Sequence, residues 1–258
     1  MVLLPFVDLD PDLTALRPLG GFFLLRTAGD PPGALPTLAD AYAGRSSHVY
    51  GHSMIFRVRK VARSIRAPEE RVAASVAHQG LAARLWSIAL GCAVLYGRLP
   101  DLDPRLVRWD PDAGAPDDLW LTRVRPLPVD RLAEVVLEGH LEPLAAVVRA
   151  DHRLAPGLLW GNAASALAGA ARQLERWAGD HGRPDLVAAT RSLAGRLFTH
   201  PLLAGTGRLE ASGTGAGGPV FRRRSCCLYY RVPGGGVCGD CCFTRPPRSS
   251  PHAPSGRP

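Results

Sequence analysis

Apolar residues recur at three- and four-residue spacing through the middle of the chain, which predicts a mainly helical protein. Pro68 is followed by two glutamates, a favourable helix start, and the apolar positions then continue to about Leu95. The same reasoning predicts helices over about 130–139 and 143–153, and a further helix that begins at Pro184.

One apolar stripe also runs through the segment "WGNAASALAGAARQLERWAGD", which begins at Trp160. Its members lie three or four residues apart, so they share one face of a helix that packs against a core. Asn162 is expected to cap the start of this helix, and Gly179 is expected to end it.

Shorter apolar runs, interrupted by proline and glycine, characterise the N-terminal part. The runs "GGFFLLRT" and "HSMIFRVRK" predict short strands, as does "DLWLTRVRP" later in the chain. The expected fold class is therefore mainly α (α+β): a helical domain with a few N-terminal strands and a small C-terminal cysteine-rich hairpin.

Changes in composition predict how the chain is divided. Residues 1–204 are expected to form the helical domain, and the glycine-rich residues 205–221 a flexible linker. Residues 222–243 hold the clustered cysteines, and residues 244–258 have the composition of a disordered tail.

The composition is that of a soluble globular protein, with 46% hydrophobic and 21% charged residues. The N-terminus lacks the basic region of a secretory signal, and the most apolar run, "LWSIALGCAVLY", is too short to span a bilayer. We therefore expect a cytoplasmic protein, in which thiols stay reduced and clustered cysteines bind metal or carry redox chemistry.

Five of the six cysteines fall within "SCCLYYRVPGGGVCGDCCF". Cys226 and Cys227 are separated by ten residues from Cys238, which forms a Cys-x-x-Cys pair with Cys241. Such a pair holds two thiolates on one turn, and the proline and glycines before it allow the β-prone run "CCLYYRV" to fold back as a hairpin. Four thiolates can bind zinc or an iron–sulfur cluster.

Several alternatives remain open at these cysteines. Adjacent cysteines suit one tetrahedral zinc poorly, because neighbouring side chains in a strand point apart, but a vicinal disulfide or buried free thiols also fit the pattern. Cys242 could replace Cys241 as a ligand, although Cys241 forms the shorter chelate with Cys238. Cys92 lies in an apolar helix and is expected to be a core residue.

The stretch "RRRSCCLYYRVPGGGVCGDC" resembles the C-terminal motif of the FhuF family of ferric siderophore reductases. Upstream, "GLAARLWSIALGCAVL" and "LLWGNAASAL" resemble the helical region of that family, so the resemblance covers roughly residues 50 to 242. It implies a [2Fe-2S] cluster on Cys226, Cys227, Cys238 and Cys241. The implied reaction is one-electron reduction of a ferric siderophore of the hydroxamate type, which releases Fe(II).

The helical part is then implied to bind the siderophore. The candidate contacts are Arg84, Trp86, Trp160 and Asn162. Each also has a structural interpretation: a salt bridge for the arginine, core positions for the tryptophans and a helix cap for the asparagine.

Positive charge is concentrated beside the cysteines, since residues 222–258 hold seven arginines and one acidic residue. We expect Arg222–Arg224 and Arg231 to raise the reduction potential of the cluster. The same charge could attract an acidic electron donor such as a ferredoxin or flavodoxin, and a membrane importer could be contacted peripherally. No helix that reads DNA is evident, so no nucleic-acid partner is expected.

The sequence contains none of three common catalytic motifs: Gly-x-Ser-x-Gly, the P-loop and His-Glu-x-x-His. Two alternatives to a reductase remain, namely an iron–sulfur sensor and a zinc-stabilised ligand-binding module.

Overall fold

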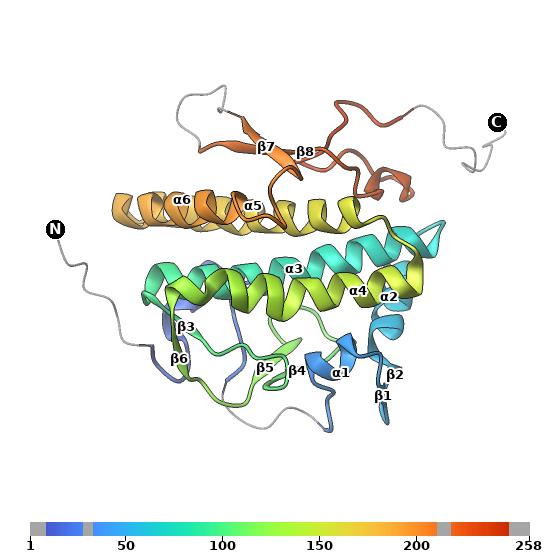
Figure 1. Ribbon diagram of the computed structural model, residues 1–258, viewed down its shortest axis with the longest axis horizontal. Coiled ribbons are helices and arrows are strands. Elements are labelled where there is room, and N and C mark those ends of the chain that lie inside the picture. Colours follow the sequence, from blue (N-terminus) through green and yellow to red (C-terminus); the bar gives the residue numbers. More distant parts are fainter. Residues whose placement is uncertain (1–8, 28–32, 211–217, 248–258) are drawn as a thin grey trace.

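The computed structural model describes residues 9–27, 33–210 and 218–247. It confirms the mainly helical fold. The two longest helices, α3 (Glu70–Leu95) and α5 (Pro156–Asp180), pack against each other at the centre (Figure 1). α6 (Pro184–Phe198) packs beside α5, and α2 (Ser53–Ser64) packs beside α3. Because α3 is apolar on nearly all sides, it is enclosed by its neighbours and forms the centre of the core.

The periodicity predicts α3 and α6 correctly. Over about 130–153, however, where two helices were expected, the chain forms one continuous helical stretch. A π-helical segment, Glu134–Leu141, runs directly into α4 (Glu142–His152). Pro143 lies in the first turn of α4, so it marks the change from π to α hydrogen bonding instead of a new helix. Asp130 lies in a short 3-10 turn, Val129–Arg131, ahead of this stretch.

The segment "HSMIFRVRK", expected as a strand, forms most of α2 instead. Its β-branched residues favour a strand, but Met54 and Val58 are both buried and lie four residues apart, which is the spacing of one helix face. Packing of this face against α3 therefore outweighs the strand propensity. A shorter helix, α1 (Leu38–Tyr42), precedes α2 and is capped by the side chain of Thr37.

The start of α5 also differs from the prediction. The helix begins at Pro156, six residues before Asn162, so Asn162 lies inside the helix and does not cap it. Proline is favourable there, because the first turn of a helix needs no backbone N–H donor. The preceding helix α4 ends where Arg153 adopts a left-handed backbone with φ 52°.

The strands in the described residues are short and pair as antiparallel two-stranded ribbons. The run "DLWLTRVRP" divides between two of these ribbons, and "GGFFLLRT" contributes only an isolated bridge from Arg26 to Trp120, so the strand predicted there is wrong. The ribbons are β1 (Ser46–Ser47) with β2 (Gly51–His52), β3 (Arg98–Pro100) with β6 (Pro126–Pro128), β4 (Val107–Trp109) with β5 (Leu119–Leu121), and β7 (Gly207–Glu210) with β8 (Val220–Arg223).

The C-terminal part departs from the prediction at two places. The expected linker over 205–221 contains β7 and the start of β8, and its residues 211–217 lie outside the described part. The run "CCLYYRV" forms no strand, because Leu228 has a left-handed backbone with φ 67° and a 3-10 turn, Tyr229–Arg231, follows. The expected disordered tail lies largely outside the described residues, from 248 onward.

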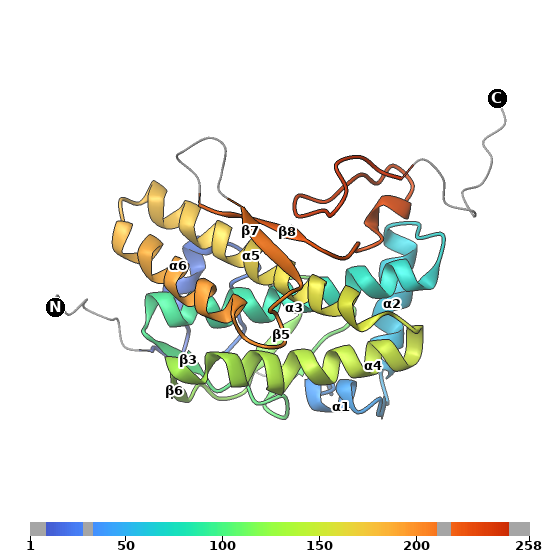
Figure 2. The ribbon, with the colours of Figure 1, turned by 45° about the horizontal axis from the view of Figure 1, so that its top comes forward.

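The β7–β8 ribbon and the cysteine segment lie over α5 and the start of α3, and both Figure 1 and Figure 2 show the cysteine segment beside the end of α2. Across the described ranges, none of the helices has a stretch long and apolar enough to cross a membrane.

Candidate metal centre

The fold-back of the C-terminal segment brings Cys227 and Cys238 together, with 3.7 Å between their Sγ atoms. Two thiolates on one tetrahedral metal with bonds of about 2.3 Å lie roughly 3.8 Å apart. Both cysteines are free thiols, so no disulfide closes this segment. The pair therefore has the spacing that a shared metal ion requires.

Each of the four predicted ligands has a backbone N–H group directed at its sulfur. The N–H of Leu228 donates to Cys226 Sγ at 3.3 Å, and the N–H of Phe243 donates to Cys241 Sγ at 3.4 Å. The backbone N–H groups of Tyr229 and Asp240 act to lower the pKa of Cys227 and of Cys238. In every case the donor lies two residues after the cysteine. Four such donors stabilise negative charge on sulfur, as thiolate ligands of a metal need.

Proton affinity differs among these thiols. Hydrogen bonds from the thiols of Cys226 and Cys238, in that order, lower the pKa of Cys227 far below its usual value. The same contacts with Cys227 are the largest cause that raises the pKa of Cys226 and of Cys238. The thiols of Cys226, Cys227 and Cys238 therefore interact closely with one another, as expected for ligands of one metal centre.

The structure favours Cys241 over Cys242 as the fourth ligand. Cys241 is buried, and its backbone N–H donates to the carbonyl of Cys238 at 3.0 Å, which closes the Cys-x-x-Cys turn. Among the described contacts of Cys242, the backbone N–H that acts on its sulfur is its own and not that of the residue two positions later. Burial raises the pKa of the Cys242 thiol.

A single-ion site is not preformed: among the described residues, no three Cys, His, Asp or Glu side chains converge as ligands of one ion. A [2Fe-2S] cluster has a different requirement, because each of its two irons takes two thiolates. One preformed pair, two neighbouring free cysteines and a donor at every sulfur fit that requirement. The residues present are therefore compatible with this cofactor.

Asp240, inside the Cys-x-x-Cys turn, ties the turn to α5. Its buried carboxylate forms an ion pair with Arg172, with Nη1 2.8 Å from Oδ1, and accepts a hydrogen bond of 2.5 Å from Ser165 Oγ. Both partners project from α5. The turn that presents Cys238 and Cys241 is thus held by a rigid element.

Cys227, of the adjacent cysteines 226 and 227, is held by a second buried network. Ser75 Oγ of α3 donates to the carbonyl of Cys227 at 2.8 Å, and Asn162 Nδ2 of α5 donates to the carbonyl of Ser75 at 2.9 Å. Asn162 Oδ1 in turn accepts from Arg223 Nη2 at 2.7 Å. Sequence reasoning singled out Asn162 but gave no signal that it joins α3, α5 and β8.

Close approach of α5 to this network requires glycine at position 161. A Cβ atom there would lie 2.3 Å from Ser225 Oγ and 3.0 Å from Arg223 Nη2, whereas one at Gly169 in the same helix would meet nothing closer than 3.9 Å. We expect G161A to destabilise the protein by about 1–3 kcal/mol through overpacking. G169A is the matched control and should stabilise it by about 0.5–1 kcal/mol. Urea unfolding of both variants tests this, and equal midpoints would contradict the close approach.

Three of the four predicted substrate contacts are inaccessible in this structure. Arg84, Trp86 and Asn162 are buried, and Trp160 is half-buried against the core. Arg84 Nε donates to both oxygens of Asp118, at 2.9 and 3.2 Å, so the salt-bridge interpretation of this residue is confirmed. Substrate contact by these residues stays a prediction.

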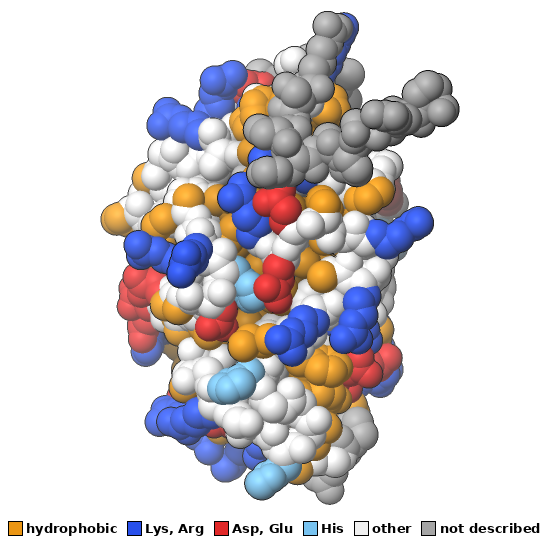
Figure 3. Space-filling view, turned by 90° about the vertical axis from the view of Figure 1, so that its right-hand side faces the viewer, with side chains coloured by type: hydrophobic (Ala, Val, Ile, Leu, Met, Phe, Trp, Pro, Cys, Tyr) orange, Lys and Arg blue, Asp and Glu red, His pale blue; other side chains and the backbone are white. Residues whose placement is uncertain are grey.

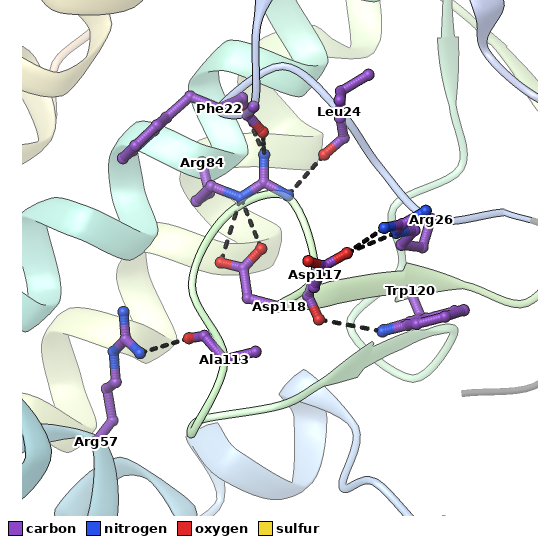
Figure 4. A network of polar contacts seen from close by, with 10 residues as sticks. Phe22, Leu24, Arg26, Arg57, Arg84, Ala113, Asp117, Asp118 and Trp120 are labelled. Carbon is purple, nitrogen blue, oxygen red and sulfur yellow. Dashed lines mark hydrogen bonds and ion pairs between the residues drawn. The ribbon is translucent and has the colours of Figure 1, made fainter. Parts of the chain in front are cut away.

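Arg84 also fastens the N-terminal segment to α3 (Figure 4). Its guanidinium donates to the carbonyls of Gly21, Phe22 and Leu24, the last at 2.6 Å. Burial lowers the pKa of Arg84, and the charge of Asp118 partly opposes this effect. Cys92 is fully buried in α3, as expected for a core residue, and burial raises its pKa.

An open cavity of about 510 Å³ lies along the outer face of α2 and the β1–β2 ribbon. Arg59 and Arg63, one helical turn apart, are exposed in it, and within the described residues neither forms an ion pair. Lys60 also borders the cavity but is paired with Asp112 at 2.6 Å. Sequence reasoning missed this site, because the run that contains Arg59 was predicted to be a strand, whereas four-residue spacing places Arg59 and Arg63 on one face only in the helix that forms.

Comparison with protein families gives two matching regions. The family described as "Ferric iron reductase FhuF-like transporter" matches residues 74–207, which is more than half of the chain. The family described as "FhuF 2Fe-2S C-terminal domain" matches residues 223–243, the segment that contains the paired cysteines. No curated protein gives a match.

Proposed function

Since the chain belongs to the FhuF-like ferric iron reductase family, we propose that it is an oxidoreductase that passes one electron to a ferric siderophore and so releases Fe(II). The observation that carries the proposal is the arrangement of Cys226, Cys227, Cys238 and Cys241, each with a backbone donor at its sulfur. When bound to these four thiolates, a [2Fe-2S] cluster supplies one-electron transfer.

The residues of this chain position and insulate that centre. Asp240 and Ser75 fix the two cysteine pairs to α5 and α3, so little rearrangement accompanies a change in charge. No side chain needs to act as acid, base or nucleophile. One electron converts Fe(III) to Fe(II), which binds the hard oxygens of a siderophore more weakly and dissociates.

We place the electron donor on the exposed face of the cysteine segment. Tyr229, Val237 and Phe243 are exposed apolar side chains there, and Arg224 and Arg245 are exposed arginines in and just after the same segment. An apolar centre with positive charge around it complements an acidic one-electron donor of the ferredoxin or flavodoxin type. A cytoplasmic location and peripheral contact with a membrane importer are further parts of this proposal.

The cavity along α2 is the proposed siderophore site. Figures 1 and 2 place α2 beside the cysteine segment, and Figure 3 shows Lys and Arg side chains over this end of the molecule with hydrophobic side chains between them. Arg59 and Arg63 can donate to the chelating oxygens of a ferric hydroxamate, while Tyr50 and Phe56 border its apolar part.

We expect R59Q/R63Q to raise the dissociation constant for a ferric trihydroxamate about tenfold to a hundredfold, because charge-assisted hydrogen bonds are lost. Quenching of protein fluorescence by the chelate measures this. R45Q is the matched control, since Arg45 is exposed, pairs with Asp40 and does not border the cavity. Equal affinity of R59Q/R63Q and R45Q would place the substrate elsewhere.

The function itself is tested by mixing the reduced protein with a ferric trihydroxamate, without air, beside a dye that binds Fe(II). We expect stoichiometric oxidation of the protein and Fe(II) release, both lost in C227S/C238S. A wild-type protein that reduces the chelate no faster than C227S/C238S would refute the proposal.

The same experiment separates the two alternatives. An iron–sulfur sensor would carry the cluster but transfer no electron to the chelate, and a zinc-stabilised module would be colourless. The pairwise arrangement of the cysteines favours a cluster over one zinc ion, because it brings two sulfurs together and not four.

A further inference from the structure

Arg223, at the end of β8, is a buried cation whose partners are all neutral. Only 2% of its surface is exposed. Its guanidinium donates to the carbonyl of Ser225 at 3.0 Å, to Asn162 Oδ1 at 2.7 Å and to the carbonyl of Leu158 at 3.3 Å. Gln79 Oε1 lies 3.5 Å from Nη1. Throughout the part of the chain that the structure describes, no carboxylate pairs with this guanidinium.

A buried charge without a partner of opposite charge is costly, so proteins pair such charges or bind an ion beside them. Neutral oxygens satisfy the N–H groups of Arg223 but leave its charge uncompensated. The Arg84 guanidinium shows the contrast, because it is equally buried and is paired with Asp118. An anion close to Arg223 would account for the difference.

The candidates for that anion are the cysteine sulfurs of the same segment. The backbone N–H of Arg223 donates to the carbonyl of Asp240 at 2.9 Å, between Cys238 and Cys241, and Ser225, which accepts from its guanidinium, adjoins Cys226. The guanidinium is also linked to Cys227 through Asn162, which accepts from Arg223 and donates to Ser75, whose hydroxyl donates to the carbonyl of Cys227.

We propose that Arg223 is the buried counter-ion of the thiolate-bound cluster and the main side-chain charge that sets its reduction potential. This rests on the proposed function in one respect, namely that the four cysteines hold a redox cluster. Reduction adds a negative charge, and a fixed cation in a region of low polarity stabilises that charge more than one in water. Arg223 therefore raises the potential.

The neighbouring arginines are expected to change the reduction potential less than Arg223 does. Arg231 is paired with Glu69, and Arg222 lies 3.8 Å from Glu210 and donates to the carbonyl of Cys241. Arg224 is exposed, so water and salt screen its charge. The sequence predicted that all four arginines raise the reduction potential. We now assign most of this effect to Arg223.

Two other polar groups near the network leave this assignment unchanged. Asp240 is neutralised by Arg172, with 2.8 Å between Oδ1 and Nη1. His78 is buried without a hydrogen-bond partner in the described part of the chain, and burial, then the charge of Arg223, lowers its pKa to about 3. At neutral pH His78 is therefore uncharged.

The test is the midpoint potential of R223Q, measured by redox titration of the visible and EPR signals. We expect the equilibrium constant for reduction to fall at least about tenfold, which is about 59 mV for one electron. R222Q and R224Q are the matched controls and should each change it by less than about threefold, with most of that change lost at high salt. The shift in R223Q should persist at high salt, because a buried charge is poorly screened.

Two further variants keep the test decisive if R223Q does not fold. R223K retains the charge and should stay near the wild-type potential. Q79E introduces a carboxylate beside the guanidinium at a half-exposed position and should lower the potential without removing Arg223. Cluster-loaded R223Q or Q79E with a wild-type potential would overturn the inference alone. A wild-type protein without a cluster would overturn it together with the proposed function.

Discussion

Replacing Cys227 or Cys238 with serine is expected to abolish assembly of the cluster, so that bound iron and sulfide fall to background. Their sulfurs lie 3.7 Å apart, the spacing that a shared metal ion requires. Serine is a much weaker ligand for iron than a thiolate. Iron and sulfide analysis after anaerobic reconstitution measures the effect.

Matched controls for this experiment lie in the same chain. C242S alters a cysteine in the same segment that is not needed as a ligand, and C92S alters a core cysteine of α3. Both should bind iron and sulfide as the wild type does. Full cluster content in C227S, or loss of the cluster in C242S but not in a Cys241 variant, would contradict the assigned ligand set.

Replacing Arg84 with methionine is expected to lower the free energy of unfolding by about 3–5 kcal/mol, because Asp118 is left buried without its partner. The carbonyls of Gly21, Phe22 and Leu24 also lose their donors. Urea unfolding of the protein measures the change. The expected change is in stability, because Arg84 holds the N-terminal segment to α3 (Figure 4).

A neighbouring ion pair gives the control for Arg84. Arg26 pairs with Asp117, next to Asp118 in sequence, but both side chains are about half exposed, at 49% and 55%. R26M should therefore cost less than about 1 kcal/mol. The double variant R84M/D118L removes both buried charges and should recover much of the loss. Equal effects of R84M and R26M would show that burial does not govern this pair.

The long helices could be predicted from the sequence because their apolar residues follow the helical period over many turns. α3 and α6 show this most directly. α2 could not, since its short run of Ile and Val matches a strand, and only contact with α3 decides between the two. The β7–β8 ribbon was missed for a related reason: glycine-rich composition predicts flexibility, but Gly207–Glu210 pairs with Val220–Arg223.

The candidate centre shows a similar division. Cysteine spacing together with the resemblance to the FhuF family identified Cys226, Cys227, Cys238 and Cys241, and their role as ligands stays a prediction that the paired sulfurs support. The residues that hold them could not be ranked from sequence, because their contacts lie far apart in the chain. Ser75 and Cys227 are 152 positions apart, and nothing local distinguishes buried Arg223 from its two arginine neighbours.

The most direct test of the whole account is the EPR and visible spectrum of the full chain purified without air, with iron and sulfide analysis. The account predicts a red-brown protein with about two irons and two sulfides per chain, whose EPR signal appears only on reduction. A colourless protein that holds zinc, and that binds neither iron nor sulfide after reconstitution, would contradict it.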